Sequence, residues 1–267
     1  MAYARSKTQK KQMKKDKLYS QYKAQKNKTN TVKLIKEVIA KEQETKLVIQ
    51  NIAVDSNSYI TNADMIPLLP RLVQDQGEGN AYERVGMKIS PRKLKVHCHV
   101  GIQDEVNRSL AITVHYFVLQ STIYKNTTSA LANVNMLRLL RTGNSTQYKG
   151  FEGTIADAMY PINNADFKLL KRGKFNLQKN TGIIQDEISA GNQPLVGPVC
   201  KDWVFDLEAP AKLTYEQDNN SPRVVYYPNG YAPFIVFGYT HQDGSDPDGI
   251  NQDIAVSVSS HLYYDDA

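Results

Sequence analysis

The 267-residue chain has few cysteines and no long run of apolar residues. It contains two cysteines, Cys98 and Cys200, and one tryptophan. Two thiols cannot form a disulfide framework, and we expect both to be buried as small apolar side chains. No run reaches the roughly 18 apolar residues of a membrane-spanning helix, and the polar start is unlike a signal peptide. We therefore expect a folded protein that is not anchored in a membrane.

Signatures of catalysis are also missing from the sequence. Gly77-Glu78-Gly79 begins like a nucleotide-binding loop, but Tyr82 stands where the third glycine of G-x-G-x-x-G belongs. The segment also leads into a predicted strand, so no helix N-terminus would receive a phosphate. No G-x-S-x-G element or other nucleophile motif is present. We predict no catalytic residues and no enzymatic activity.

The histidines provide one alternative. His97-x-His99 places two imidazoles on the same face of a strand, as metal binding in cupins requires, and His115 is available as a third ligand. However, Pro233 stands where the second cupin motif needs its histidine. We therefore predict no metal ligands here and keep a cupin-like metal enzyme as an alternative.

A second candidate for metal binding is the acidic stretch Asp243–Asp253, "DGSDPDGINQD". Its Asp246, Asp248 and Gly249 have part of the spacing of a calcium loop, but the closing glutamate is missing. Asp-Gly turns account for the same residues without a metal. Calcium stays open, and no other cofactor is predicted.

Acidic residues are almost absent from the first 36 positions, which carry twelve basic residues against Asp16 alone. This segment therefore has a charge of +11, and because the whole chain is +6, residues 37–267 carry −5. A basic segment joined to an acidic body is typical of nucleic-acid binding. The residues that we predict to contact nucleic acid are Arg5, Lys7, Lys10, Lys11, Lys14, Lys15, Lys17, Lys23, Lys26 and Lys28.

We define residues 1–43 as the arm. Its first 30 residues have too little apolar surface to offset their ordering entropy, so we expect them to be mobile when free and helical on a polyanion. Thr31–Glu44 has the apolar spacing of a short helix. Lysines without tryptophan or phenylalanine favour binding through phosphates, independent of base sequence. The same lysine run is typical of a nuclear import signal.

Beyond the arm, apolar residues alternate with a period of two. Lys46–Val54 reads as a strand, Arg92–Ile102 buries Leu94, Val96, Cys98, Val100 and Ile102, and Ser109–Ser121 is apolar on both faces. We predict a hairpin that turns at Arg172–Gly173 and a helix over Ser129–Gly143. Further strands are predicted within residues 200–208, 212–217, 223–227, 233–241 and 253–266.

Strands with long loops and few helices exclude a doubly wound α/β fold. We therefore predict an all-β protein, in which residues 44–267 form a single eight-stranded antiparallel jelly roll that follows a partly helical basic arm.

The order of these elements resembles two families. The lysine-rich arm followed by "LVQDQGEGNAYERVGMKISPRKLKVHCHVGI" is similar to capsid proteins of small circular Rep-encoding single-stranded DNA viruses. "AITVHYFVLQ", "MLRLLRTGN", "FKLLKRGKFNLQ" and the closing "YYDDA" resemble the coat proteins of satellite necrosis viruses, which are small plant RNA satellites. The likeness covers most of the chain beyond Gln43 and rests on short motifs, chiefly Gln76-Gly77 and Arg84-x-Gly86.

The resemblance implies a subunit that self-assembles into a small T=1 icosahedral shell, with the arms on a single-stranded genome. We expect DNA in preference to RNA, the virion as location with the host nucleus as the site of assembly, and a host receptor of unknown kind. The satellite relatives also imply calcium at subunit contacts. A non-viral nucleic-acid-binding jelly roll remains a second alternative.

Overall fold

The computed structural model describes residues 23, 31, 45–72, 86–103, 106, 110–143, 147–179, 198–215, 227–247, 249 and 251–266. The chain divides into two compact units, Met1–Glu44 and Thr45–Ala267. All the strands lie in the second unit. No helix in the described ranges is long and apolar enough to cross a membrane.

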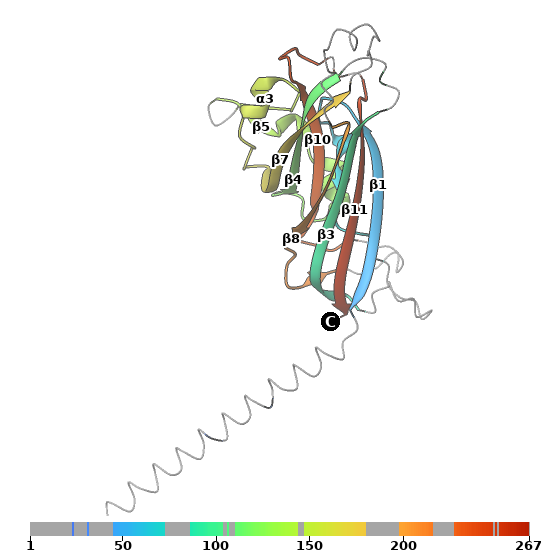
Figure 1. The fold of residues 1–267 in the computed structure, drawn as a ribbon. Coiled ribbons are helices and arrows are strands. Elements are labelled where there is room, and N and C mark those ends of the chain that lie inside the picture. Colours follow the sequence, from blue (N-terminus) through green and yellow to red (C-terminus); the bar gives the residue numbers. More distant parts are fainter. Residues whose placement is uncertain are drawn as a thin grey trace, which may run out of the picture. The chain divides into compact units, whose positions relative to one another are not determined.

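Two antiparallel sheets form the second unit (Figure 1). The first, here called the β1 sheet, joins in order β1 (Lys46–Ser56), β11 (Ile254–Asp266), β3 (Lys88–Ile102) and β8 (Cys200–Leu207), and the short β9 (Leu213–Thr214) pairs with β3. The second, the β10 sheet, joins β2 (Ile66–Pro67), β10 (Pro233–His241), β4 (Leu110–Ser121) and β7 (Phe167–Lys179). The prediction of an all-β, antiparallel protein is confirmed.

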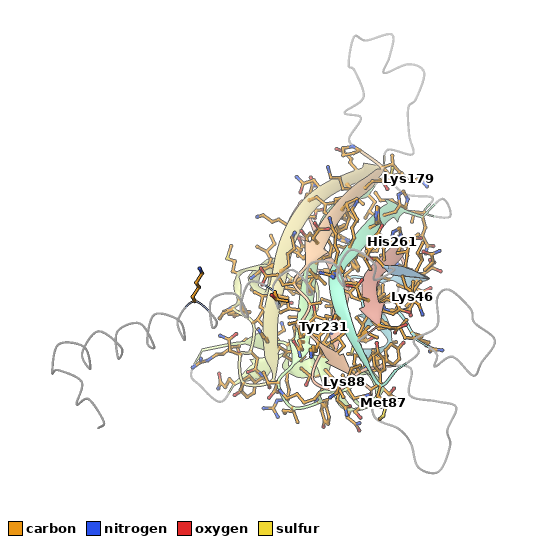
Figure 2. All side chains as sticks on the ribbon, turned by 90° about the horizontal axis from the view of Figure 1, so that it is seen from below. Lys46, Met87, Lys88, Lys179, Tyr231 and His261 are labelled. Carbon is orange, nitrogen blue, oxygen red and sulfur yellow. The ribbon has the colours of Figure 1, made fainter. Side chains whose placement is uncertain are left out.

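The main core lies between the two sheets, where side chains of both fill the space (Figure 2). Val96 and Val100 of β3 pack there together with Val114 of β4, and all three side chains are fully buried. The face of β3 that the alternating pattern predicted to be buried is confirmed, because each apolar residue of that face is at most 5% exposed. Alternation identified this face because successive side chains of a strand point to opposite sides.

A third layer covers the other face of the β10 sheet. It contains α2 (Thr127–Asn133), the 3-10 turn η2 (Met136–Arg138), the short strands β5 (Leu140–Arg141) and β6 (Tyr148–Lys149), and α3 (Ile155–Met159). Phe117 and Phe234 of the sheet pack with Phe151 of this layer in a second buried cluster. β4 therefore lies between two cores, which confirms the prediction from its two apolar faces. A further 3-10 turn, η1 (Asn62–Asp64), precedes β2.

The single helix predicted over Ser129–Gly143 is wrong. The helix α2 ends at Asn133, and Asn135 starts η2 by accepting a hydrogen bond from the backbone N–H of Leu137 with its side chain. An asparagine that caps a new turn interrupts the helical ladder. Leu139 and Leu140 are then free to enter the second core by a different path.

The hairpin predicted at Arg172–Gly173 is also wrong, because β7 runs through both residues and pairs with β4 along its length. Gly173 stands opposite Tyr116, and a Cβ atom at this position would lie 2.5 Å from the Tyr116 ring. Glycine here permits the ring to approach the backbone. The irregularity in the pairing lies between Val118 and Leu119, where Leu170 of β7 has no partner.

Candidate functional site

The arm residues predicted to bind nucleic acid fall mostly outside the described residues. Lys23 is described and is helical and exposed, and so is Thr31. The outer nine, Arg5, Lys7, Lys10, Lys11, Lys14, Lys15, Lys17, Lys26 and Lys28, lie outside that part, as does the rest of the helix predicted to follow Thr31. The evidence for a basic arm therefore comes from the sequence, and the described residues add only Lys23 to it.

The glycine-rich stretch before β3 has a structural role at its described end. Gly77, Gly79 and Tyr82 lie outside the described residues, but Gly86 and Met87 form a bend that leads directly into β3 at Lys88. A strand follows, and not a helix, so the main condition for a phosphate-binding loop fails at this place. The strand begins at Lys88, four residues before the predicted Arg92.

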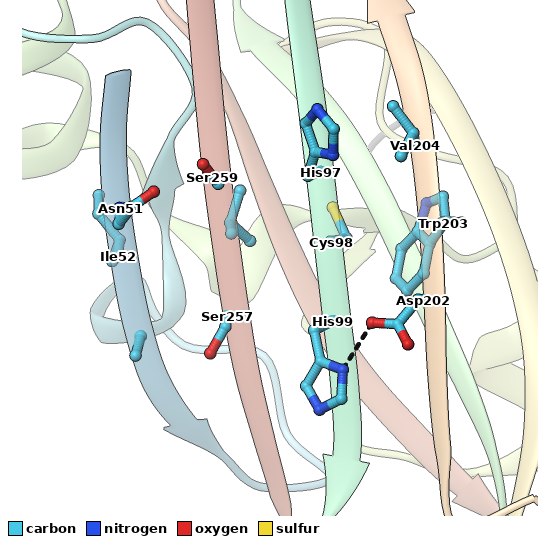
Figure 3. Close-up of a pocket in the computed structure, with 12 residues that line it drawn as sticks. Asn51, Ile52, His97, Cys98, His99, Asp202, Trp203, Val204, Ser257 and Ser259 are labelled. Atoms are coloured by element: carbon cyan, nitrogen blue, oxygen red, sulfur yellow. Dashed lines mark hydrogen bonds and ion pairs between the residues drawn. The ribbon is translucent and has the colours of Figure 1, made fainter.

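His97 and His99 lie on the solvent side of the β1 sheet, beside a cavity of about 500 Å³ (Figure 3). Nδ1 of His99 lies 2.6 Å from Oδ1 of Asp202 on β8. The His97 ring stacks on the ring of His261, with centroids 4.6 Å apart. Both partners of the His99–Asp202 pair are well exposed, so solvent screens the attraction and the pair adds little stability.

This face does not assemble the metal site that the cupin alternative requires. His115 belongs to the other sheet, where its side chain is buried and its Nε2 lies 3.3 Å from Oγ1 of Thr240. It therefore cannot join His97 and His99. No group of three metal-ligating side chains occurs in the described part of the chain. On the β1 sheet, partial burial and the neighbouring His97 and Lys95 lower the pKa of His261.

Two carboxylates of the acidic stretch after β10, Asp243 and Asp253, accept hydrogen bonds from within the protein. Asp243 accepts hydrogen bonds from the backbone N–H and the hydroxyl of Ser245, which lower its pKa. Asp253 is buried and accepts a hydrogen bond of 2.6 Å from the hydroxyl of Tyr239. Asp248 lies outside the described residues. Gly244 and Gly249 have positive φ values, as expected of the turns that the sequence suggested.

The cysteines differ from each other, which corrects the prediction that both are buried. Cys98 is free and packs in the main core, and burial raises its pKa to about 12. Cys200 is free and exposed at the start of β8. Its position at the edge of the β1 sheet, opposite Gly101, keeps it outside the core.

A second cavity, of about 660 Å³, lies over the outer face of β7 where the third layer ends; we call it the β7 cavity. Its lining comes from β4, α3, β7 and the end of β10: Thr113, His115, Ile155, Ala158, Met159, Arg172, Gly173, Lys174, Asn176, Thr240, His241 and Gln242. β7 itself carries five basic residues and no acidic one, although the body as a whole is acidic. Two of these basic residues, Arg172 and Lys174, line the cavity.

Two cations dominate the β7 cavity. Arg172 lies over the Phe117 ring, with its guanidinium carbon 5.1 Å from the ring centroid, and its Nη2 donates a hydrogen bond of 2.6 Å to the carbonyl oxygen of Ala158. These contacts fix the guanidinium plane at the cavity wall. Lys174 is two residues further along the same face of β7. Burial first, and then these two cations, lower the pKa of His115 to about 4, so its imidazole is neutral at pH 7.

We compared the sequence with known proteins. No protein-family model and no curated protein matches this chain.

Sequence reasoning missed the β7 cavity. Arg172 and Gly173 suggested a turn, which hid the fact that Arg172 and Lys174 share one face of a strand. The sequence did contain one signal: all the charged residues of "FKLLKRGKFNLQK" are basic, although the body as a whole is acidic. The contribution of Thr113 and Thr240 from other strands could not be read from spacing, because it depends on how the sheet is ordered.

Proposed function

We propose that this chain is the capsid protein of a small virus: a jelly-roll subunit that self-assembles into a T=1 icosahedral shell and packages a single-stranded genome, DNA in preference to RNA, through its lysine-rich arm. The protein would then act in the virion, with assembly in the host nucleus. The observation that carries the proposal is the nested pairing of the strands, combined with the basic arm that precedes them.

Support for a jelly roll comes from the way the two halves of the body pair. β1 pairs with β11, β2 with β10, β3 with β8, and β4 with β7. Successive pairs alternate between the β1 sheet and the β10 sheet. These pairs are the ones expected when one long hairpin folds over into two facing sheets, as in an eight-stranded jelly roll, and they support that fold. The remaining β5, β6 and β9 are two-residue additions.

Support for packaging comes from the charge distribution. Residues 1–36 carry +11 and residues 37–267 carry −5, which favours contact between the arm and a polyanion, while the bodies repel one another. Many arms in one shell would act together and raise the overall affinity far above that of one arm. If all eleven net charges of residues 1–36 neutralise phosphates of a single strand, log K should fall with log salt with a slope of about −8.

Support for self-assembly comes from apolar side chains on the surface. Leu137 is 68% exposed and Ile123 is 60% exposed, both in the segment between β4 and β7. Ile49 on the outer face of β1 is 49% exposed. Large apolar residues at such positions are expected at protein–protein contacts, because a shell would remove them from water.

Negative-stain electron microscopy of the purified full-length protein tests the proposal. We expect closed particles of uniform size, with nucleic acid that is released on disassembly and degraded by a nuclease specific for single strands. A protein that elutes as a monomer or small oligomer under all conditions, with nucleic acid bound, would instead support the non-viral alternative. Bound transition metal in elemental analysis would revive the metal enzyme.

A further inference from the structure

The two cations of the β7 cavity, Arg172 and Lys174, form no ion pair with a carboxylate among the described residues. Among the described residues, none that lines the cavity is acidic. Residues two apart on a strand are separated by about 6.6 Å, so the two cations can contact one anionic group or two adjacent ones.

The rest of the polar lining consists of neutral hydroxyl and amide groups. Thr113 donates a hydrogen bond of 3.0 Å to Oδ1 of Asn176, which leaves the Asn176 amide nitrogen available to a ligand. Gln242 donates from its amide nitrogen to the carbonyl oxygen of Ile112, 2.9 Å away, which leaves its side-chain oxygen as an acceptor. Such groups match the hydroxyls of a sugar.

The part of the lining that the structure describes contains no tyrosine, phenylalanine or tryptophan. Binding of single-stranded nucleic acid usually relies on aromatic rings that stack with bases, and the cavity offers none. Its volume, about 660 Å³, falls in the range of pockets that enclose small ligands. The chemistry therefore favours an anionic carbohydrate over a nucleotide base.

The cavity lies near the end of β1 that is farther from Lys46. The arm joins β1 at Lys46, which pairs with Tyr264 near the end of β11, whereas Ser56 pairs with Ile254 at its start. The hydrogen bond between Tyr239 and Asp253 places the end of β10, and so the cavity, near Ile254. Ten residue steps of β1 separate the two ends by about 33 Å. The cavity is thus separated by about this distance from Lys46, the first residue of β1.

From these observations we infer that the β7 cavity binds a sugar that carries a sulfate or phosphate ester, with Arg172 and Lys174 on the ester and Asn176 and Gln242 on the sugar hydroxyls. In a capsid this site would recognise an anionic glycan on the host surface. Only that last role rests on the proposed function; the binding chemistry stands without it.

The test must separate this cavity from the arm, which also attracts polyanions. We would use the full-length chain with Arg5 and the nine predicted arm lysines changed to glutamine, and follow the methyl resonance of Met159 by NMR. Met159 lines the cavity and is 78% exposed. The probes are a heparin-derived tetrasaccharide, its desulfated form, a phosphorylated oligosaccharide and a short oligothymidylate.

We expect the sulfated or the phosphorylated oligosaccharide to shift the Met159 methyl resonance with saturation, and the desulfated form to leave it in place. The variant R172Q/K174Q should weaken binding roughly tenfold or more, because two charge-assisted contacts are lost. The charge-matched control K201Q/K212Q changes two exposed lysines outside the cavity and should leave the affinity within about twofold.

Comparison of the two anionic probes identifies the ester. Arg172 also donates a hydrogen bond to Ala158, so R172Q/K174Q could lower the melting temperature. In that case the affinity of the single variant K174Q is the measurement that tests the inference. An unmoved Met159 resonance with both oligosaccharides, equal loss in the control variant, or tighter binding of oligothymidylate would each overturn the inference. None of these results depends on whether particles form or package a genome.

Discussion

Gly173 lies where β7 passes the ring of Tyr116, and its replacement by alanine tests whether this region is one continuous strand. An alanine Cβ would lie 2.5 Å from the Tyr116 ring, far inside normal contact distance. The ring cannot move away easily, because it packs against Trp203 and Phe237, with centroids 5.1 Å and 6.4 Å away. Either the ring or the strand must therefore shift.

Overpacking of this kind costs about 1–3 kcal/mol, and the lower entropy of the unfolded alanine chain returns about 0.4–1 kcal/mol. G173A should therefore lower the free energy of unfolding by about 1–2 kcal/mol, measured by urea denaturation. In a hairpin turn, alanine would not meet the Tyr116 ring at all.

Gly101 provides a matched control, because it also lies inside a strand. A Cβ there would be 3.4 Å from that of Cys200, an ordinary contact, so G101A should be neutral or slightly stabilising. Without the ring, in the Y116L background, G173A should cost much less stability than it does in the wild-type protein. Unchanged stability of G173A, or an equal loss in G101A, would refute the reasoning.

Three further predictions concern buried polar groups and thiols. Asp157 is fully buried, accepts two backbone hydrogen bonds and lies 3.0 Å from Nζ of Lys149, so D157A should lower the free energy of unfolding by roughly 3 kcal/mol in urea denaturation. The pKa of His115 is lowered from 6.5 to about 4, so the unfolded chain binds a proton that the folded chain does not. Stability should consequently fall as the pH drops from 6.5 towards 4, and in H115Q the melting temperature should depend less on pH across this window. Identical pH profiles of the melting temperature for H115Q and the wild-type protein would contradict the assignment. A thiol reagent should label one cysteine, Cys200, in the native protein and reach Cys98 only on unfolding, whereas rapid labelling of both would place Cys98 outside the core.

Strands with clear alternation were predictable from sequence. β3 and β11 lie within four residues of their predicted bounds, because their buried faces repeat every second residue. β10 has the predicted bounds, Pro233–His241, and is buried on both faces. β2 was missed because two residues, Ile66 and Pro67, are too short to show a period. β7 was split in two because an Arg-Gly pair is typical of turns, and the Tyr116 ring that requires the glycine lies 57 positions away in sequence.

The candidate sites divide in the same way. The arm could be recognised from charge alone, since a run of lysines needs no fixed geometry to attract phosphate. The β7 cavity could not, because it depends on three neighbouring strands and on α3, and sheet order is not encoded in local spacing. The nested strand pairs are likewise a property of the folded chain.

The nucleic-acid content of particles formed by an arm variant tests the central claim most directly. The variant changes Arg5, Lys7, Lys10, Lys11, Lys14, Lys15, Lys17, Lys23, Lys26 and Lys28 to glutamine, which leaves Lys33 and Lys36 against Asp16. We predict that its body melts at the wild-type temperature while the ratio of nucleic-acid to protein absorbance falls to that of empty protein, and that K201Q/K212Q retains the wild-type ratio. Particles of the arm variant with wild-type nucleic-acid content would contradict the account.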